Sequence, residues 1–288
     1  GSALFKKGIH VMALQAQMKL LRVRKEFLIS FFCMLVISIA SFSINCVQQY
    51  GLDVTQYLSA DKLFIGRAYS NDFFTFLQFL LPLLFVLPFA DSYITDRRHY
   101  ILPAILSRAS AKQYYFSKLS CVGLSTGTVV FLPFLLNFLL GLIAFPMTST
   151  NYSHFSLSAD QSPYYTSYMK EILFPGLFVD HPYLYNFIFL LLLTVFGMLC
   201  AVVTYQLSFL IVKNRIVLLC LPFLLNNFLI LFAQYTPVDI SPFDYLFSFN
   251  NAPHKQPFML AVFFGVLILA VVCLTPVCLK KLREIEGK

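Results

Sequence analysis

The segment 96–118 joins charged side chains to a short apolar helical pattern, and these residue types suit docking onto another protein. Its apolar residues recur at the spacing of one helix face, and Pro103 is tolerated in a first helical turn. A helix this short does not fold alone, so it needs a surface to dock onto. A simple connector at the membrane interface is the alternative. The candidate docking residues are Arg97, Arg98, Ile101, Leu102, Ile105, Leu106 and Arg108.

Amide side chains inside long apolar stretches form a second group of candidates. An amide among lipid tails is costly unless it finds a hydrogen-bond partner, so these side chains should face other helices or water. For each of them, an interhelical hydrogen bond without a role in transport is the alternative. The candidates for a translocation path are Gln78, Asn137, Asn226, Asn227 and Gln234.

Motifs for catalysis, metal binding and nucleotide binding do not occur in the sequence. The five His residues have no metal-ligand spacing, and no HExxH or GxxxxGK[ST] motif is present. The seven Cys residues are scattered without a CxxC pair. We therefore expect no metal, no cofactor and no enzymatic activity in this chain, and an intramembrane enzyme is a less favoured alternative.

The elements that position these residues belong in a membrane. Of the 288 residues, 59% are hydrophobic and 12% are charged, and the mean hydropathy is +0.76. A soluble domain carries about 25% charged residues. Lipid accepts the excess apolar surface that water would not. The sequence predicts an all-α integral membrane protein with six transmembrane helices in a single transmembrane domain, residues 1–288.

Six apolar runs are long enough to cross the hydrocarbon core as helices. Residues 4–26 before them predict an amphipathic helix lying in the inner interface, close to membrane lipids. Residues 236–257 are rich in Pro and Phe and predict short helices or re-entrant turns resting at the outer interface. The predicted spans are about 27–47, 73–92, 119–145, 184–212, 216–235 and 258–278.

The distribution of Lys and Arg gives these spans an orientation. With six spans, 17 of the 21 basic residues fall on one side of the membrane, and only Lys62, Arg67, Lys170 and Lys255 fall on the other. Cytoplasmic loops carry the excess of Lys and Arg, so both termini are expected in the cytoplasm. The net charge of +8 is then a signature of topology, and we expect no nucleic-acid partner.

Ionisable residues are nearly absent from the predicted spans. Only Asp91 lies at a span boundary, and we expect it close to Arg97 or Lys118. Ion-coupled carriers usually keep a carboxylate or a histidine inside the membrane. The pattern therefore favours a process whose energy comes from outside the membrane.

The segment between the second and third spans resembles permeases of the type-2 ABC exporter family. The resemblance rests on an acidic-basic pair at Asp96 and Arg97, the short apolar helix, the Arg108-Ala109-Ser110 turn and an aromatic run ending in Lys118. The chain departs from the family pattern where Tyr100-Ile101-Leu102 replaces a common Gly-Thr-Leu. In that family this segment is the coupling helix, which sits in a cleft of the ATPase subunit, and residues 4–26 resemble the connecting helix.

The resemblance implies a permease subunit of an ATP-driven exporter in a bacterial plasma membrane. Its partners would be a cytosolic ABC ATPase that binds ATP and Mg, and a second permease subunit, as a homodimer or a heterodimer. The cargo would be an amphipathic peptide, an antibiotic or a lipid-like molecule. A membrane scaffold or sensor that transports nothing is the main alternative.

Overall fold

The computed structural model describes residues 24–52, 58–64, 71–107, 109–147, 173–211, 214–233, 235–236, 240–248 and 257–286. All regular structure within these residues is helical, as the fold prediction requires. In chain order the elements are α2 (Lys25–Gln49), η2 (Ala60–Lys62), α3 (Asn71–Val86), α4 (Ser92–Arg98), α5 (Ile101–Leu106), α6 (Ala111–Ala144), α8 (Pro175–Asp180), α9 (Pro182–Leu207), α10 (Arg215–Ala233), α11 (Pro242–Leu246) and α12 (Pro257–Glu286).

Five of these helices, α2, α6, α9, α10 and α12, are long and apolar enough to cross a membrane. The chain is therefore a multi-pass membrane protein by helix length and hydropathy. These five helices coincide with the first, third, fourth, fifth and sixth predicted spans. The apolar runs in the sequence indicated where these helices lie. A backbone that is buried or faces lipid must satisfy its own hydrogen bonds, and a helix does so.

The second predicted span, residues 73–92, is not one continuous helix. Helix α3 ends at Val86, residues 87–91 form turns, and α4 begins at Ser92. Pro88 lacks a backbone N–H and its ring crowds the preceding turn, which ends the regular ladder of hydrogen bonds. Thr126 on α6 donates its hydroxyl to the carbonyl oxygen of Phe85 at 2.7 Å, so a neighbouring helix supplies a hydrogen bond at the break.

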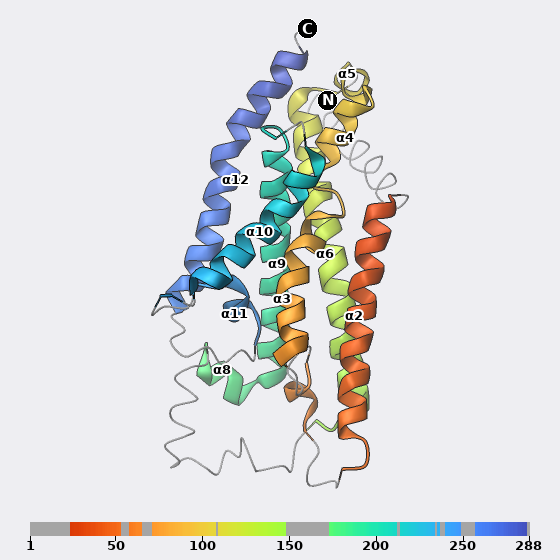
Figure 1. Ribbon diagram of the computed structural model, residues 1–288, viewed down its shortest axis with the longest axis vertical. Coiled ribbons are helices and arrows are strands. Elements are labelled where there is room, and N and C mark those ends of the chain that lie inside the picture. Colours follow the sequence, from red (N-terminus) through yellow and green to blue (C-terminus); the bar gives the residue numbers. More distant parts are fainter. Residues whose placement is uncertain are drawn as a thin grey trace, which may run out of the picture.

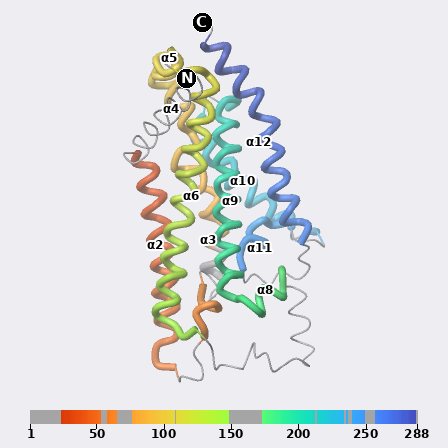
Figure 2. The backbone as a smooth tube through the Cα atoms, turned by 180° about the vertical axis from the view of Figure 1, so that it is seen from behind, coloured from red at the N-terminus to blue at the C-terminus, as the bar shows by residue number. Residues whose placement is uncertain are grey.

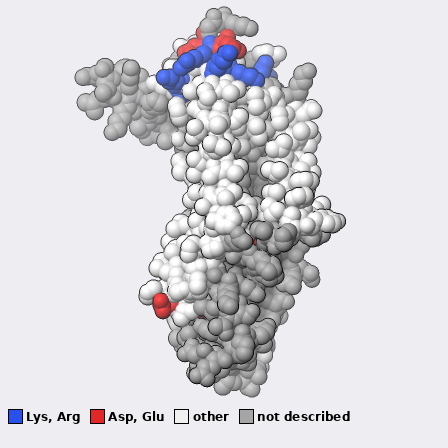
Figure 3. All heavy atoms as spheres, turned by 90° about the vertical axis from the view of Figure 1, so that its left-hand side faces the viewer, with Lys and Arg blue, Asp and Glu red and all other residues white. Residues whose placement is uncertain are grey.

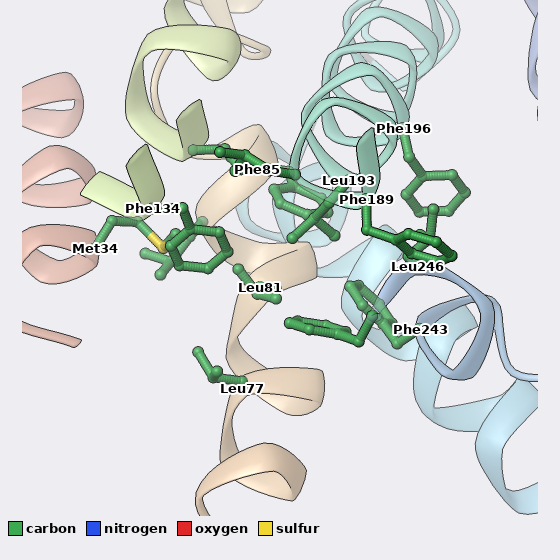
Figure 4. Packing of buried hydrophobic residues seen from close by; sticks show 14 of the residues in the cluster. Met34, Leu77, Leu81, Phe85, Phe134, Phe189, Leu193, Phe196, Phe243 and Leu246 are labelled. Atoms are coloured by element: carbon green, nitrogen blue, oxygen red, sulfur yellow. The ribbon is translucent and has the colours of Figure 1, made fainter. Parts of the chain in front are cut away.

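The helices pack side by side along the long axis of the molecule. Figures 1 and 2 show α2, α6, α9 and α12 following one another across the bundle, with α3 against α9 and α10 inclined across the face that α3 lies on. The large apolar cluster between them is drawn in Figure 4, where residues of α2, α3, α6, α9 and α11 meet. Gly197 on α9 allows α9 to lie close to α3, because a Cβ at this position would lie 3.0 Å from the Phe85 ring.

Charged side chains gather at one end of the bundle. Figure 3 shows Lys and Arg side chains at the end where α4, α5 and the end of α12 lie, while the rest of that face is largely uncharged. We call this the basic end; η2 and α8 lie toward the opposite end (Figure 1). Among the described residues, the basic end carries Arg24, Lys25, Arg97, Arg98, Lys112, Lys118, Arg215, Lys280, Lys281 and Arg283.

Helix α11 lies inside the bundle. The prediction of a short helix within residues 236–257 is confirmed, and this helix packs against the bundle. Its position at the outer membrane interface stays a prediction. Phe243, Tyr245 and Leu246 are almost completely buried. The Phe243 ring lies 6.2 Å from the rings of both Phe85 and Phe196, so aromatic packing against α3 and α9 holds the segment in place.

The predicted interfacial helix 4–26 lies almost entirely outside the described residues. Of that segment, Arg24 is extended and precedes α2, and Lys25 and Glu26 belong to the first turn of α2. The seven cysteines are free thiols in the bundle helices, in agreement with the absence of a cysteine framework.

Candidate functional site

The short helix α5 forms where the sequence predicts it, at the basic end of the bundle (Figure 1). Leu102 and Leu106 are 2% and 7% exposed and belong to an apolar cluster shared with α6, α9 and α12. Ile101 is 47% exposed, and Ile105 is partly buried against the same cluster. Of the four apolar candidates, Ile101 and Ile105 therefore retain surface for another protein, whereas Leu102 and Leu106 serve the chain's own core.

A basic and aromatic surface leads into α5. Arg97 and Arg98 are exposed, and so is Tyr100, whose φ of 55° places it in the left-handed region at the turn between α4 and α5. Such a conformation is unfavourable for a bulky residue and is held by the structure around it. Arg97 also lies against the Tyr93 phenol. Arg108 lies outside the described residues.

Below this surface, Asp91 forms ion pairs with two arginines from distant parts of the chain. Asp91 is completely buried, and its carboxylate oxygens lie 3.0 Å from Nη2 of Arg24 and 2.5 Å from Nε of Arg215. Glu26 completes the group through Arg215 at 2.5 Å and Arg24 at 3.7 Å. The Asp91 cluster, consisting of Arg24, Glu26, Asp91 and Arg215, thus ties the start of α4 to the starts of α2 and α10.

The cations within salt-bridge distance of Asp91 are Arg24 and Arg215, and not the Arg97 or Lys118 that we expected nearby. The sequence marked these two arginines only as topological charges. Each of them stands next to the start of an apolar run, and this position is the signal that could have suggested a neutralising carboxylate at the same depth. Nothing in the sequence indicates which of the basic residues at that depth would be chosen.

A second buried ion pair ties α4 to α6. Nζ of Lys118 lies 2.9 Å from Oδ2 of Asp96, and the Tyr114 hydroxyl donates to the same oxygen at 2.7 Å. We call these three residues the Asp96 cluster. Lys118 is only 1% exposed, so an uncompensated charge there would be very unfavourable.

The two clusters meet at one aromatic ring. The Arg24 guanidinium carbon lies 4.9 Å and the Lys118 ammonium 4.8 Å from the centre of the Phe89 ring, which belongs to the turn between α3 and α4. Phe89 is itself buried. The unit formed by α4 and α5 is therefore joined by charged contacts to α2, α6 and α10.

The amide candidates for the path do not form one group. Gln78 and Asn226 are brought together with Asp244 of α11. Nδ2 of Asn226 donates to the backbone carbonyl of Gln78 at 3.0 Å, and Nε2 of Gln78 donates to Oδ1 of Asp244 at 2.8 Å. We call these three residues the Asp244 cluster. Its polar atoms join α3, α10 and α11 within the bundle.

The other candidates lie elsewhere. Asn137 donates to the carbonyl of Ser38 at 2.8 Å and so links α6 to α2. Asn227 follows Asn226 on α10 but points about 100° away from it around the helix. Gln234 lies outside the described residues. A further amide, Gln206, bonds to Tyr115 and Thr275 and joins α9 to α6 and α12.

Among the residues that the structure describes, no group of three or more His, Cys, Asp or Glu side chains is placed to hold a metal ion. The arrangement supports charged docking at the basic end and hydrogen bonding in the bundle. No protein-family model, curated protein or solved structure matches this chain.

Proposed function

We propose that this chain is the permease subunit of an ATP-driven exporter of the type-2 ABC kind. The observation that carries the proposal is the unit of α4 and α5, which presents a small docking surface at the basic end and is anchored by buried ion pairs to three long helices. In this reading α5 is the coupling helix. ATP and Mg belong to a separate cytosolic ATPase subunit.

The topology supports this reading. The α3–α4 segment provides the second of six membrane crossings, since α3 is apolar and α4 lies at the basic end (Figure 1). The excess of Lys and Arg there assigns the basic end to the cytoplasm of a plasma membrane, most simply a bacterial one. The described ends of α2 and α12 that lie closest to the chain termini are then on the cytoplasmic side.

The exposed surface defines the chemistry of the ATPase partner. Arg97, Arg98 and Tyr100 are exposed and directly precede the exposed Ile101 in the chain, so a complementary cleft would offer acidic side chains beside an apolar pocket. Such a cleft pushing on α5 acts on a rigid body, because Asp91 and Asp96 hold α4 to neighbouring helices. Movement of the ATPase is thereby passed to α2, α6 and α10 together.

A path for cargo needs a second permease subunit, either a copy of this chain or a relative. The faces of α10 and α12 are rich in exposed apolar side chains, which suit lipid or a partner helix. The cargo class is an amphipathic peptide, an antibiotic or a lipid-like molecule. This part of the proposal rests on the resemblance and on the apolar interior.

The test is a single charge placed on the docking surface. The Ile101→Asp variant and wild type are co-purified with a candidate ABC ATPase from the same organism, and bound ATPase, ATP hydrolysis and transport are measured. We expect association and stimulated hydrolysis to fall at least about tenfold, because an acidic side chain is desolvated against an acidic cleft.

The matched control is Ile101→Leu, which keeps the apolar contact and should retain wild-type association. Leu106 is unsuitable for this test, since it is buried in the chain's own core and its replacement by Asp would disturb folding. Unchanged association and hydrolysis in a folded Ile101→Asp protein would overturn the coupling role. Association without transport in the wild type would instead favour the scaffold or sensor.

A further inference from the structure

At the basic end, α12 carries a groove of about 430 Å³, and we propose that this groove binds the headgroup of an anionic phospholipid. The groove is lined by Pro276, Leu279, Lys280, Arg283 and Glu284. The proposal requires only that the chain is a multi-pass membrane protein, so it is independent of any ATPase partner. Figure 3 faces the side on which α12 lies in Figure 1, and it shows Lys and Arg side chains bordering a largely uncharged surface.

The lining residues form one face of α12. Residues three and four positions apart are neighbours on a helix surface, and the five lining residues follow this spacing. Cys278 and Leu282 lie on the opposite face, where they are buried in the apolar cluster shared with α6 and α9. The groove therefore belongs to the face of α12 that is directed away from this cluster.

The groove lies where α12 leaves the hydrocarbon. A helix of 30 residues is about 45 Å long, whereas the hydrocarbon core is about 30 Å thick. Residues 257–279 contain no Asp, Glu, Lys or Arg, and Lys280 is the first charged residue of the helix. Pro276 and Leu279 are thus at the depth of acyl chains, and Arg283 is one turn farther toward water. A phospholipid has the same order of apolar and charged parts.

The two cations of the groove are available to a ligand. Lys280 and Arg283 are exposed, and neither forms an ion pair within the part of the chain that the structure describes. Lys281, in contrast, donates to the carbonyl of Phe209 at 2.8 Å and so serves the chain's own packing. With Glu284 as the only lining carboxylate, the groove keeps a net positive charge. Guanidinium and ammonium groups together suit a phosphate, and basic residues at a membrane surface favour anionic lipids.

The apolar surface beside the groove favours a lipid over a soluble phosphate compound. Leu269, Val272 and Cys273 are exposed and continue the face of Pro276 along the helix, away from the charged residues. An acyl chain attached to the bound phosphate would lie along this face, whereas a free phosphate would leave it uncontacted. The occupant is therefore an anionic glycerophospholipid, with its phosphate at Lys280 and Arg283.

The test measures lipid binding to the full chain, purified in a non-ionic detergent and freed of lipid. Phosphatidylglycerol is titrated, and native mass spectrometry gives the dissociation constant of the first bound lipid. Phosphatidylcholine with the same acyl chains is the comparison, because its headgroup has a phosphate but no net charge. We expect phosphatidylglycerol to bind at least about tenfold more tightly than phosphatidylcholine.

The decisive variant combines Lys280→Gln with Arg283→Gln, two exposed changes that leave the buried face of α12 intact. We expect it to bind phosphatidylglycerol at least about tenfold more weakly than wild type, with binding of phosphatidylcholine unchanged. The matched control combines Lys25→Gln with Lys112→Gln, which removes the same charge from exposed residues at the basic end but outside the groove. It should bind phosphatidylglycerol within about twofold of wild type.

An equal loss in both double variants would show that the end as a whole attracts anionic lipid, and it would overturn the proposal. Equal binding of the two lipids by wild type would overturn it too, and so would displacement of phosphatidylglycerol by an equal concentration of glycerol 3-phosphate. If the decisive variant fails to fold, Glu284→Gln replaces it. Removal of this negative charge should tighten binding of phosphatidylglycerol at least about twofold, and unchanged or weaker binding would overturn the proposal.

Discussion

The molecule contains two polar regions, and they satisfy their buried groups in different ways. At the basic end, the buried carboxylates of Asp91 and Asp96 lie against cations contributed by other helices. In the Asp244 cluster, the Gln78 amide donates to the Asp244 carboxylate, and the Asn226 amide donates to the backbone carbonyl of Gln78. The Oδ1 atom of Asn226 has no hydrogen-bond partner among the described residues. The first arrangement joins helices through pairs of opposite charge, and the second joins them through the amide groups of Gln78 and Asn226.

The largest effect is expected for Asp91→Ala. The change leaves Arg24 and Arg215 at a buried position without their carboxylate, so the free energy of unfolding should fall by about 3–5 kcal/mol. The free energy of unfolding is measured by titration with sodium dodecyl sulfate in mixed micelles. Lys112→Ala, an exposed change at the same end, should alter stability by less than about 0.5 kcal/mol. If the free energy of unfolding falls by less than about 1 kcal/mol in Asp91→Ala, the ion pairs of the Asp91 cluster do not hold the helices together.

A smaller loss is expected for Tyr114→Phe, which removes the hydroxyl bonded to the Asp96 carboxylate. Hydrogen bonds to charged groups contribute about 1.5–3 kcal/mol, and the same unfolding measurement should show a loss in that range. Tyr115→Phe is the control, because the adjacent hydroxyl bonds only to the neutral side chains of Gln206 and Thr275. Its loss should be about 0.5–1.5 kcal/mol. Identical losses of stability in Tyr114→Phe and Tyr115→Phe would show that the hydrogen bond to the Asp96 carboxylate is no stronger than one between neutral groups.

The smallest effect on stability is expected for Asn226→Leu. It removes one hydrogen bond between helices inside the bundle, and such bonds contribute about 0.6 kcal/mol on average and up to about 1.7 kcal/mol. Asn137→Leu removes an equivalent bond to Ser38 and should cost a similar amount. A loss of stability as large as that of Asp91→Ala would show that the Asp244 cluster holds its helices together as strongly as the Asp91 cluster does.

The long helices and the short helix α5 could be predicted because both follow from local patterns. A run of about 20 apolar residues has few alternatives to a membrane helix, and the Ile101–Leu106 spacing defines one helical face. The charge asymmetry was also predictable, since Figure 3 shows the basic side chains at one end. The face of α5 directed inward could not be predicted, because it depends on where α6 begins and where α12 ends.

The remaining features depend on contacts between distant parts of the chain. Pro82 lies inside helix α3, whereas the helix ends two residues before Pro88, and the sequence alone does not distinguish the two prolines. Asp91 and Arg24 are 67 residues apart, so their pairing requires the fold. Helix α11 has the composition of an interfacial segment and is buried because the aromatic side chains of α3 and α9 surround it. No local pattern contains this information.

The interruption after α3 has a consequence for how the protein would be made in the proposed six-span topology. A helix of 16 residues is about 24 Å long, shorter than the roughly 30 Å of hydrocarbon that a nascent segment must cross. The Phe85 carbonyl at its end receives a hydrogen bond from Thr126, which is synthesised 41 residues later. In that topology we expect this part of the chain to complete its insertion only after α6 has left the ribosome. The pair is expected to enter the bilayer as one unit of biosynthesis.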